Sequence, residues 1–245
     1  MQPKKLRQSD EALELVPDDV STVEQLSSRR IQKRSAELSM IRPRGTYQRR
    51  FKRPFDLVVG SMVAVASAPL TLLIAAAVRV GLGKPVFYEQ ERIGKNGETF
   101  TIYKFRTMRP DRRRQVIDLR DGAERRNAHK SEHDPRHTGL GRKLRQTSLD
   151  ELPQVLNVLR GDMSLVGPRP EIPRIAIEGG YADHIRHEVK PGMTGPYQTS
   201  DARLNGDLRD GLDLDAEYVE NVSLRRDLQY LMRTVSVLFN SRSGS

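Results

Sequence analysis

Hydrophobic residues are concentrated in one uninterrupted run in the first third of the chain. The run, Leu57–Val78, reads LVVGSMVAVASAPLTLLIAAAV and contains 22 residues without a charge. A stretch of this length predicts a helix that crosses or enters a bilayer. More than fifty largely polar residues precede it and no clear small-residue cleavage site follows it, so the pattern is not that of a secretory signal peptide.

Pro69 lies near the middle of this run, two residues after Ser67. Proline removes a backbone N–H and clashes with the preceding turn, so a kink or break is expected there. The twelve residues before it would span about 18 Å as a helix, against a hydrocarbon core of about 30 Å. Three interpretations stay open: a kinked spanning helix, which length alone favours, a re-entrant helix-break-helix, and a buried core helix, which the length disfavours.

Shorter patterns follow the apolar run. The segment PVFYEQERIGKNGETFTIYKFRTM contains two β-rich stretches around Lys95-Asn96-Gly97, which predicts a β-hairpin. Ser148 is expected to cap a helix that begins near Leu149, because apolar residues recur at helical spacing after it. These residues, expected to form a core face, are Leu152, Val155, Leu156 and Leu159. An amphipathic helix is predicted over Leu212–Phe239, broken near Ser223.

Charge is distributed as unevenly as hydrophobicity. The formal net charge is +10, yet residues 29–53 alone hold ten Lys or Arg against Glu37, a net of +9. Because this arm precedes the apolar run, it is expected to be attracted to anionic headgroups. Such an arm is also compatible with nucleic-acid binding, although no helix-turn-helix, RNA-binding aromatic pair or zinc finger accompanies it. The chain has no cysteine, which excludes disulfides and thiolate chemistry.

Residues 109–143 are highly polar and are expected to form an exposed helix and loop. His129, His133 and His137 have the spacing of ligands on one helix face, but Pro135 interrupts that helix. A solvated loop is therefore favoured over a metal site.

Two features carry candidate chemistry. Asp150 and Glu151 are adjacent carboxylates, although acidic residues in a first helical turn are also stabilised by the helix dipole. Gly167-Pro168-Arg169-Pro170 predicts a rigid turn that fixes one guanidinium in space. We find no Walker A loop and no G-x-G-x-x-G or G-x-S-x-G motif.

Five segments in this order resemble the bacterial sugar transferases known as monotopic phosphoglycosyl transferases. They are KRPFDLVV, YKFRTMRPD, LRQTSLDELPQVLNVLRGDMSLVGPRPE, KPGMTG and YVENVSLRRDLQYLMRTV. The resemblance runs from about Lys52 to about Phe239. It implies an enzyme that transfers a sugar-1-phosphate from a UDP-sugar to a polyprenyl phosphate on the cytoplasmic leaflet and releases UMP. It also implies a re-entrant helix with a break at Ser67 and Pro69, which reverses the preference for a spanning helix.

The resemblance assigns roles to individual residues. Asp150 matches the nucleophile that forms a covalent phosphosugar intermediate, and Glu151 completes the dyad. Asp150 is also expected to bind Mg²⁺ together with the substrate phosphates. Arg169 matches the phosphate-binding arginine and Arg145 the basic position before the dyad. Lys104 and Arg106 are candidates to meet substrate phosphate or headgroups, and Arg92 has a similar but weaker claim.

The expected architecture is a mostly helical α+β monotopic membrane protein with a small β-hairpin in its catalytic domain. The domains are a flexible basic arm over residues 1–48, a membrane segment over 49–83 and a cytoplasmic catalytic domain over 84–245. Expected partners are the UDP-sugar, polyprenyl phosphate and anionic phospholipids, without nucleic acid, and a homodimer is allowed. The expected location is the cytoplasmic face of the inner membrane. Competing hypotheses are a membrane-tethered nucleic-acid-binding protein and an inactive scaffold for glycan assembly.

Overall fold

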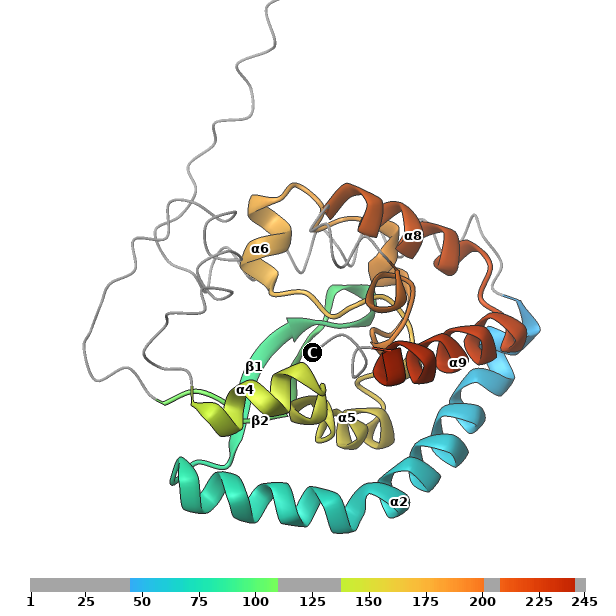
Figure 1. Ribbon diagram of the computed structural model, residues 1–245. Coiled ribbons are helices and arrows are strands. Elements are labelled where there is room, and N and C mark those ends of the chain that lie inside the picture. Colours follow the sequence, from blue (N-terminus) through green and yellow to red (C-terminus); the bar gives the residue numbers. More distant parts are fainter. Residues whose placement is uncertain (1–44, 110–137, 201–207, 241–245) are drawn as a thin grey trace, which may run out of the picture.

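The computed structural model describes residues 45–109, 138–200 and 208–240 (Figure 1). It is mostly helical with two small sheets. The helices are the π-helical turn Tyr47–Phe51, α2 (Lys52–Gly81), α4 (Gly139–Gln146), α5 (Gln154–Arg160), α6 (Pro173–Glu178), α8 (Leu208–Glu220) and α9 (Leu224–Asn240). The strands are β1 (Phe87–Ile93), β2 (Thr99–Phe105), β3 (Ser164–Val166) and β4 (Gly192–Thr194). Short 3₁₀ turns cover Lys95–Gly97, Leu149–Glu151, Ile185–Glu188 and Tyr197–Thr199.

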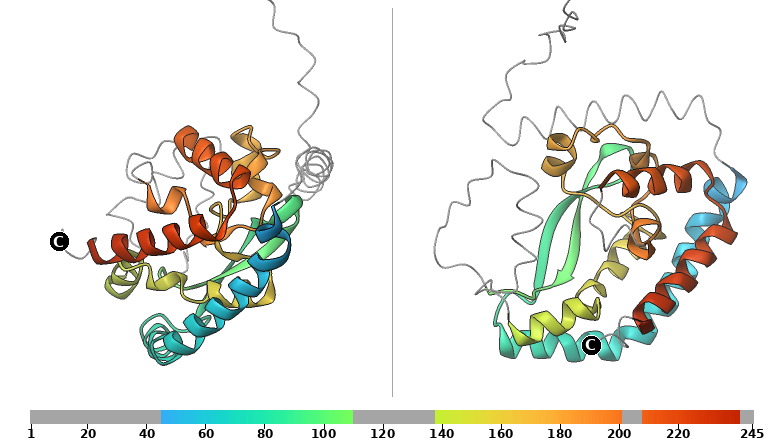
Figure 2. Two further views of the ribbon diagram at one scale, coloured as in Figure 1. Left: turned by 90° about the vertical axis from the view of Figure 1, so that its right-hand side faces the viewer. Right: turned by 45° about the horizontal axis from the view of Figure 1, so that its top comes forward.

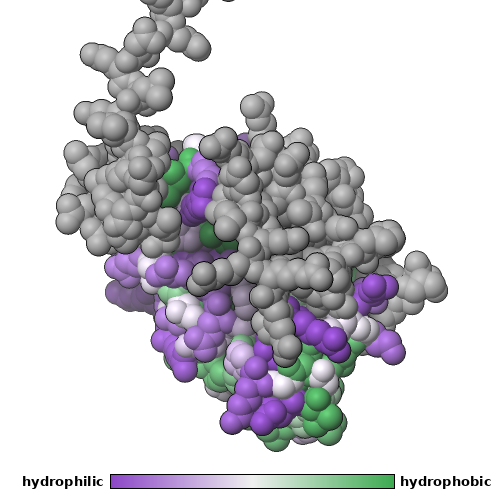
Figure 3. Space-filling model, turned by 90° about the vertical axis from the view of Figure 1, so that its left-hand side faces the viewer, coloured by the Kyte–Doolittle hydropathy of each residue, from purple (hydrophilic) through white to green (hydrophobic). Residues whose placement is uncertain are grey.

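The predicted apolar run forms most of α2. The helix continues through Pro69, and Figures 1 and 2 show that it bends along its length. Only 11% of its most apolar window is buried inside the protein, which is not the pattern of a buried core helix. By length and composition α2 is sufficient to cross a membrane. In Figure 3, hydrophobic residues gather at the lower edge of the molecule, where Figure 1 places the second half of α2.

Both halves of α2 pack against the same domain. In the first half, the buried Asp56 carboxylate accepts hydrogen bonds from Ser164 Oγ at 3.0 Å and the Leu165 N–H at 3.1 Å. In the second half, Val78 is fully buried in a hydrophobic cluster with Phe105. The bent helix therefore curves along one side of the domain and contacts it near both ends, and Figure 2 shows this from two directions.

The predicted hairpin is confirmed. β1 and β2 pair antiparallel from Phe87–Phe105 to Ile93–Thr99. Asn96 and Gly97 at the tip have positive φ angles of 58° and 80°, which these residue types adopt most readily.

β3 and β4 pair in parallel and form a second sheet. No hydrophobic pattern in the sequence predicted this sheet. Each strand has only three residues, too few for alternation to appear. The strands approach so closely at Gly192 that a Cβ there would lie 2.1 Å from the Gly167 amide nitrogen. This contact fixes the start of the Gly167–Pro170 turn against β4.

The helix expected from Leu149 begins later. Ser148 has a φ of 55° and makes no side-chain capping bond, and Asp150 lies in a separate 3₁₀ turn. α5 starts only after Pro153, and its core face consists of Val155 and Val158, whereas the expected core residue Leu156 is 44% exposed. Val155 is buried and Leu152 packs against a buried cluster, as expected. The prediction was wrong for the start of the helix and for Leu156, because it counted one continuous periodicity through a proline-containing turn.

The C-terminal prediction is confirmed, although α8 begins at Leu208 rather than Leu212 and α9 ends at Asn240 rather than Phe239. α8 ends at Glu220 and α9 begins at Leu224, so the break falls beside Ser223 as expected. Tyr218 of α8 is buried and donates to the Val166 carbonyl oxygen at 3.0 Å and to Asp227 Oδ1 of α9 at 2.7 Å. These bonds join both helices to the end of β3.

Candidate active site

A small cavity lies where β2, the Leu149–Glu151 turn and the Gly167–Pro170 turn meet. Its charged lining residues are Arg92, Lys104, Glu151 and Arg169, and the amide of Gln198 also lines it. Three basic side chains therefore face a single carboxylate in this lining. Such a charge balance favours an anionic ligand.

Lys104 joins the hairpin to the acidic turn. Its Nζ donates to Glu151 Oε1 at 2.7 Å, and both side chains are partly buried. Because Ser148 adopts the left-handed conformation, the chain turns sharply before the carboxylate pair. Glu151 thus forms an ion pair with Lys104, and both acidic residues lie in the first turn of a helix, as the structural explanation expects, although this helix is a short 3₁₀ turn.

Asp150 has an unusual electrostatic environment. Burial and the neighbouring Glu151 raise its pKa from 3.8 to about 6, while Lys104 and Arg145 oppose the rise. Arg145 lies in the last turn of α4, close enough to act on Asp150. At neutral pH the carboxylate is therefore mostly ionised yet poorly solvated, which suits a nucleophile.

Arg169 is positioned by two other arginines. Arg186 donates from Nη2 to the Arg169 carbonyl oxygen at 2.7 Å, and Arg92 donates from Nη1 to the Pro170 carbonyl oxygen at 3.2 Å. Arg186 is buried and forms an ion pair at 2.9 Å with the buried Asp215 of α8. Burial and the neighbouring Arg169 lower the pKa of Arg92. The turn is thus fixed from both sides, leaving the Arg169 side chain at the cavity.

Sequence reasoning missed Arg186, Asp215 and Gln198. Among the described residues the buried Gln198 Oε1 has no hydrogen-bond partner, although the residue lines the cavity. No motif singled out these positions, and only the neighbouring KPGMTG segment marked the region. Their distance along the chain from Asp150 concealed their spatial proximity to the site.

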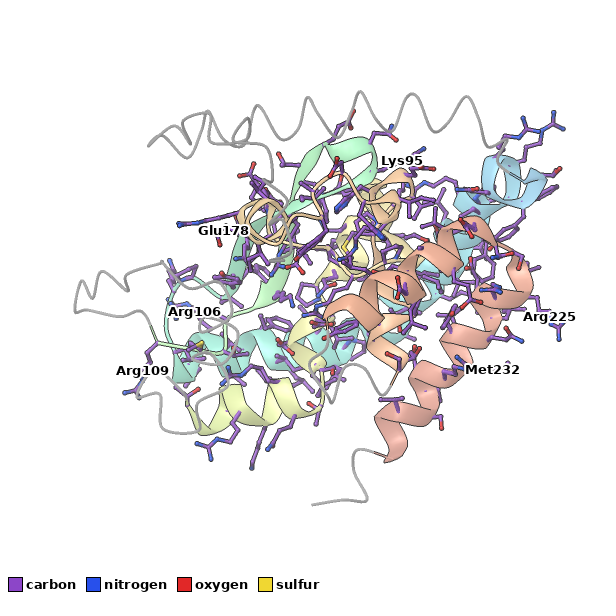
Figure 4. All side chains as sticks on the ribbon, turned by 90° about the horizontal axis from the view of Figure 1, so that it is seen from above. Lys95, Arg106, Arg109, Glu178, Arg225 and Met232 are labelled. Carbon is purple, nitrogen blue, oxygen red and sulfur yellow. The ribbon has the colours of Figure 1, made fainter. Side chains whose placement is uncertain are left out.

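Arg106 is placed elsewhere, against expectation. Its guanidinium donates to the carbonyl oxygens of Leu82, Gly83 and Lys84, the Lys84 bond measuring 2.9 Å. These carbonyls belong to the segment that follows α2, so Arg106 pairs backbone groups of that segment and fixes it beside β2. Figure 4 labels it near Arg109 and away from Lys95 at the hairpin tip. Lys104 lines the cavity and Arg106 does not.

Ser67 and Pro69, expected at a membrane break, lie within α2 and outside the cavity. Ser67 Oγ donates to the Ala64 carbonyl oxygen at 3.4 Å, a weak bond within the helix. His129, His133 and His137 lie outside the described residues, as does most of the basic arm of residues 29–53.

The described part of the chain contains no group of three or more His, Cys, Asp or Glu arranged as metal ligands. Glu151 lines the cavity, and Asp150 precedes it in the same 3₁₀ turn. Mg²⁺ commonly binds through one or two carboxylates together with substrate phosphates and waters. These residues therefore fit a magnesium site that the substrate completes, and not one formed by protein alone.

Comparisons with known proteins place the chain in a family. The family model for "Bacterial sugar transferase" matches residues 47–241. The chain belongs to this family. The Asp150-Glu151 pair, the hairpin and the Gly167–Pro170 turn all fall inside the matched region.

Three relatives indicate the range of the family. The chain is 38% identical to "Exopolysaccharide production protein ExoY" of Sinorhizobium fredii, covering 85% of the chain and 92% of that protein. It is 37% identical to "UDP-glucose:undecaprenyl-phosphate glucose-1-phosphate transferase" of Caulobacter vibrioides, covering 84% and 78%. It is 38% identical to "Undecaprenyl-phosphate galactose phosphotransferase" of Salmonella typhimurium, covering 79% of the chain but 41% of that protein. The chain spans about two-fifths of the length of several such relatives.

Proposed function

We propose that the protein is a phosphoglycosyl transferase that moves a sugar-1-phosphate from a UDP-sugar to a polyprenyl phosphate and releases UMP. The reaction would be the first membrane step in making an exopolysaccharide or another glycoconjugate, at the cytoplasmic face of the inner membrane. Family membership and the names of the relatives support the reaction class. The observation that carries the proposal is the poorly solvated Asp150 carboxylate beside a cavity lined by Lys104, Arg92 and Arg169.

The residues suit a two-step transfer. In the first step an Asp150 oxygen attacks the phosphorus that carries the sugar, the bond to UMP breaks, and UMP leaves with the electron pair. In the second step an oxygen of the polyprenyl phosphate attacks the same phosphorus and the carboxylate is restored. Arg169 and Lys104 would hold phosphate oxygens, because a planar guanidinium matches two oxygens at once. Glu151 stays in place through Lys104 and keeps that amine beside the reacting carboxylate.

Mg²⁺, when bound by Asp150 and the substrate phosphates, would neutralise charge on the leaving UMP. The chain's own cations would bind phosphate oxygens of the same diphosphate. Arg92, Lys104 and Arg169 come from the hairpin and the Gly167–Pro170 turn, and α4 supplies Arg145 near Asp150. The site thus combines a negative nucleophile with a positive lining.

We also propose that α2 is re-entrant, so that both of its ends lie on the cytoplasmic side. The contacts of Asp56 and Val78 with one domain support this, because a straight spanning helix would carry one of them to the opposite side of the bilayer. Pro69 supports it as well, since it removes a backbone hydrogen bond at the middle of the run.

Replacing the nucleophile tests the reaction. Asp150→Asn keeps the size of the side chain and removes the attacking charge, so UMP release should fall by roughly 10³-fold or more. UMP is measured with the membrane-bound protein, a set of UDP-sugars, polyprenyl phosphate and Mg²⁺. The variant should still fold, because burial disfavours the charge it removes. Full turnover by Asp150→Asn would contradict the assigned nucleophile, and no turnover by the native protein on any UDP-sugar would contradict the function.

A further inference from the structure

A second cavity lies at the beginning of α2, apart from the catalytic one. It has a volume of about 180 Å³ and shares no lining residue with the catalytic cavity. One water needs roughly 10–15 Å³ measured in this way, so the space admits a larger ligand. Its lining contains four basic side chains, Lys52, Arg53, Lys95 and Lys190, against the single acidic Asp56.

Two of these charged groups are engaged by the fold. Lys52 Nζ lies 2.6 Å from the buried Asp227 Oδ2 and also donates to the Val166 carbonyl oxygen at 3.0 Å. Asp56 accepts from Ser164 and the Leu165 N–H. Their charges are therefore largely committed to holding α2 against β3 and α9.

Arg53 and Lys190 differ from this pair, because neither forms an ion pair within the described ranges. The two terminal nitrogens of Arg53 donate to the Val158 and Leu159 carbonyl oxygens at 2.5 and 2.8 Å, which fixes the guanidinium at the end of α5. A Cβ added at Gly161 would lie 3.3 Å from both Arg53 Nη2 and Lys190 Nζ. The two cations thus converge on one point and cannot be farther apart than twice that distance.

The convergence is electrostatically unfavourable without a ligand. Burial, followed by the charge of Arg53, lowers the pKa of Lys190, and the carboxylates of Asp56 and Asp162 offset only part of this. Two cations that a fold holds together without full compensation form a site for an anion, which relieves their repulsion. A phosphate group is the right size, because its oxygens can meet the amine and the guanidinium together.

We propose that this cavity binds the phosphate group of a phosphate ester between Arg53 and Lys190. Val166, Val189 and Val222 form an apolar part of the wall, which suits the organic portion of the ester. The cavity lies at the first turns of α2, directly before the exposed apolar side chains of Leu57 and Val58. At that boundary an anionic glycerophospholipid headgroup presents this chemistry, and a soluble glycerol phosphate presents the same group.

The test compares binding by the full chain with and without the Lys190 charge. Detergent-purified protein is titrated with phosphatidylglycerol in mixed micelles, and separately with glycerol 3-phosphate and inorganic phosphate, with heat of binding as the readout. Lys190→Gln should weaken binding about tenfold, the effect of one charge-assisted hydrogen bond, and Lys190→Arg should restore it. Lys190→Gln should remain folded, because burial disfavours the charge that it removes.

Two controls separate this site from others. Lys84→Gln removes an exposed cation near the other end of α2 and should leave binding unchanged. Arg169→Ala removes the phosphate ligand of the catalytic cavity, and binding should persist in it. Binding of phosphatidylglycerol alone supports a lipid ligand, and binding of the soluble esters supports a site for free phosphate compounds. Absence of binding, equal loss in Lys84→Gln and Lys190→Gln, or loss in Arg169→Ala would overturn the proposal.

Discussion

At the scale of single residues, the proposed chemistry depends on how burial and neighbouring charges change the pKa of one carboxylate. The pKa of Asp150 is raised to about 6 by burial and by Glu151. In the proposed mechanism the ionised form of Asp150 is the nucleophile, so kcat/KM should decline as pH falls below 6 and be about tenfold lower near pH 5. Initial rates of UMP release between pH 5 and 8 measure this decline, which is the acidic limb of the pH–rate profile.

A matched variant assigns the limb to Asp150. Glu151→Gln removes the negative charge that raises the Asp150 pKa and leaves Lys104 without its partner, so the limb should move to lower pH. The comparison uses profiles normalised to their maxima, because Glu151→Gln also lowers the rate. A limb that stays in place would show that another group controls it.

Arg186 is expected to act through the position of Arg169. Because it holds the Arg169 carbonyl oxygen and pairs with Asp215, Arg186→Gln should let the Gly167–Pro170 turn shift. A shift of about 1 Å in a positioning group costs about 10²-fold, and we expect kcat to fall by roughly 10- to 100-fold. Steady-state kinetics of UMP release measure it.

Arg186→Gln also leaves the buried Asp215 carboxylate, whose pKa is already raised to about 6, without its ion-pair partner. The double variant Arg186→Gln/Asp215→Asn removes that charge and so controls for its cost. If this variant folds and still loses activity, positioning explains the loss. Arg174→Gln, which breaks an exposed pair with Glu178 on α6, should have little effect. An equal loss in Arg174→Gln would contradict the role of Arg186.

At the scale of elements, the contact between α2 and α5 depends on a glycine. A Cβ at Gly60 would lie 3.3 Å from Val158 Cγ1, so a larger side chain must separate the helices. Gly60→Leu should destabilise the protein by about 1–3 kcal/mol through overpacking. Thermal unfolding in detergent measures this. Ser61→Leu places the same side chain on the exposed side of α2 and should be nearly neutral, and equal destabilisation by both would contradict the packing argument.

The elements that the sequence predicted correctly have strong local signals. The hairpin follows from Asn96-Gly97 between two β-rich stretches, and α9 from its amphipathic periodicity. β3 and β4 were missed because a three-residue strand has no pattern of its own and exists only through a distant partner. The start of α5 was misplaced because a 3₁₀ turn and a helix share similar spacing near Pro153.

The same distinction holds for the site. The motifs identified Glu151 and Arg169, which line one cavity with Lys104, and Asp150, which lies beside Glu151 in the same turn. They did not identify Arg186, whose effect passes through a backbone carbonyl and is therefore invisible in sequence. Arg106 was misjudged because its motif lies beside Lys104, although its side chain binds the carbonyls after α2.

At the scale of the whole molecule, α2 and α9 together present apolar surface to the outside. Leu224, Leu228, Met232 and Val235 are exposed along α9, and Figure 4 shows Met232 and Arg225 on its outer side. The apolar side chains of the bent α2 are exposed as well. Removing these apolar side chains from water lowers the free energy, and the apolar interior of a bilayer provides such an environment. The exposed apolar surface therefore agrees with a membrane location.

The topology of α2 is the last prediction, and the sequence makes its test direct. Because the chain has no cysteine, the single variants Arg49→Cys and Lys84→Cys each carry one unique labelling site. Arg49 lies before the apolar run and Lys84 lies after it. A re-entrant helix predicts that a membrane-impermeant maleimide labels both in inverted membrane vesicles and neither in intact spheroplasts. Labelling after permeabilisation controls for access. Labelling of either cysteine from outside would contradict the re-entrant helix, which the contacts of Asp56 and Val78 with one domain support.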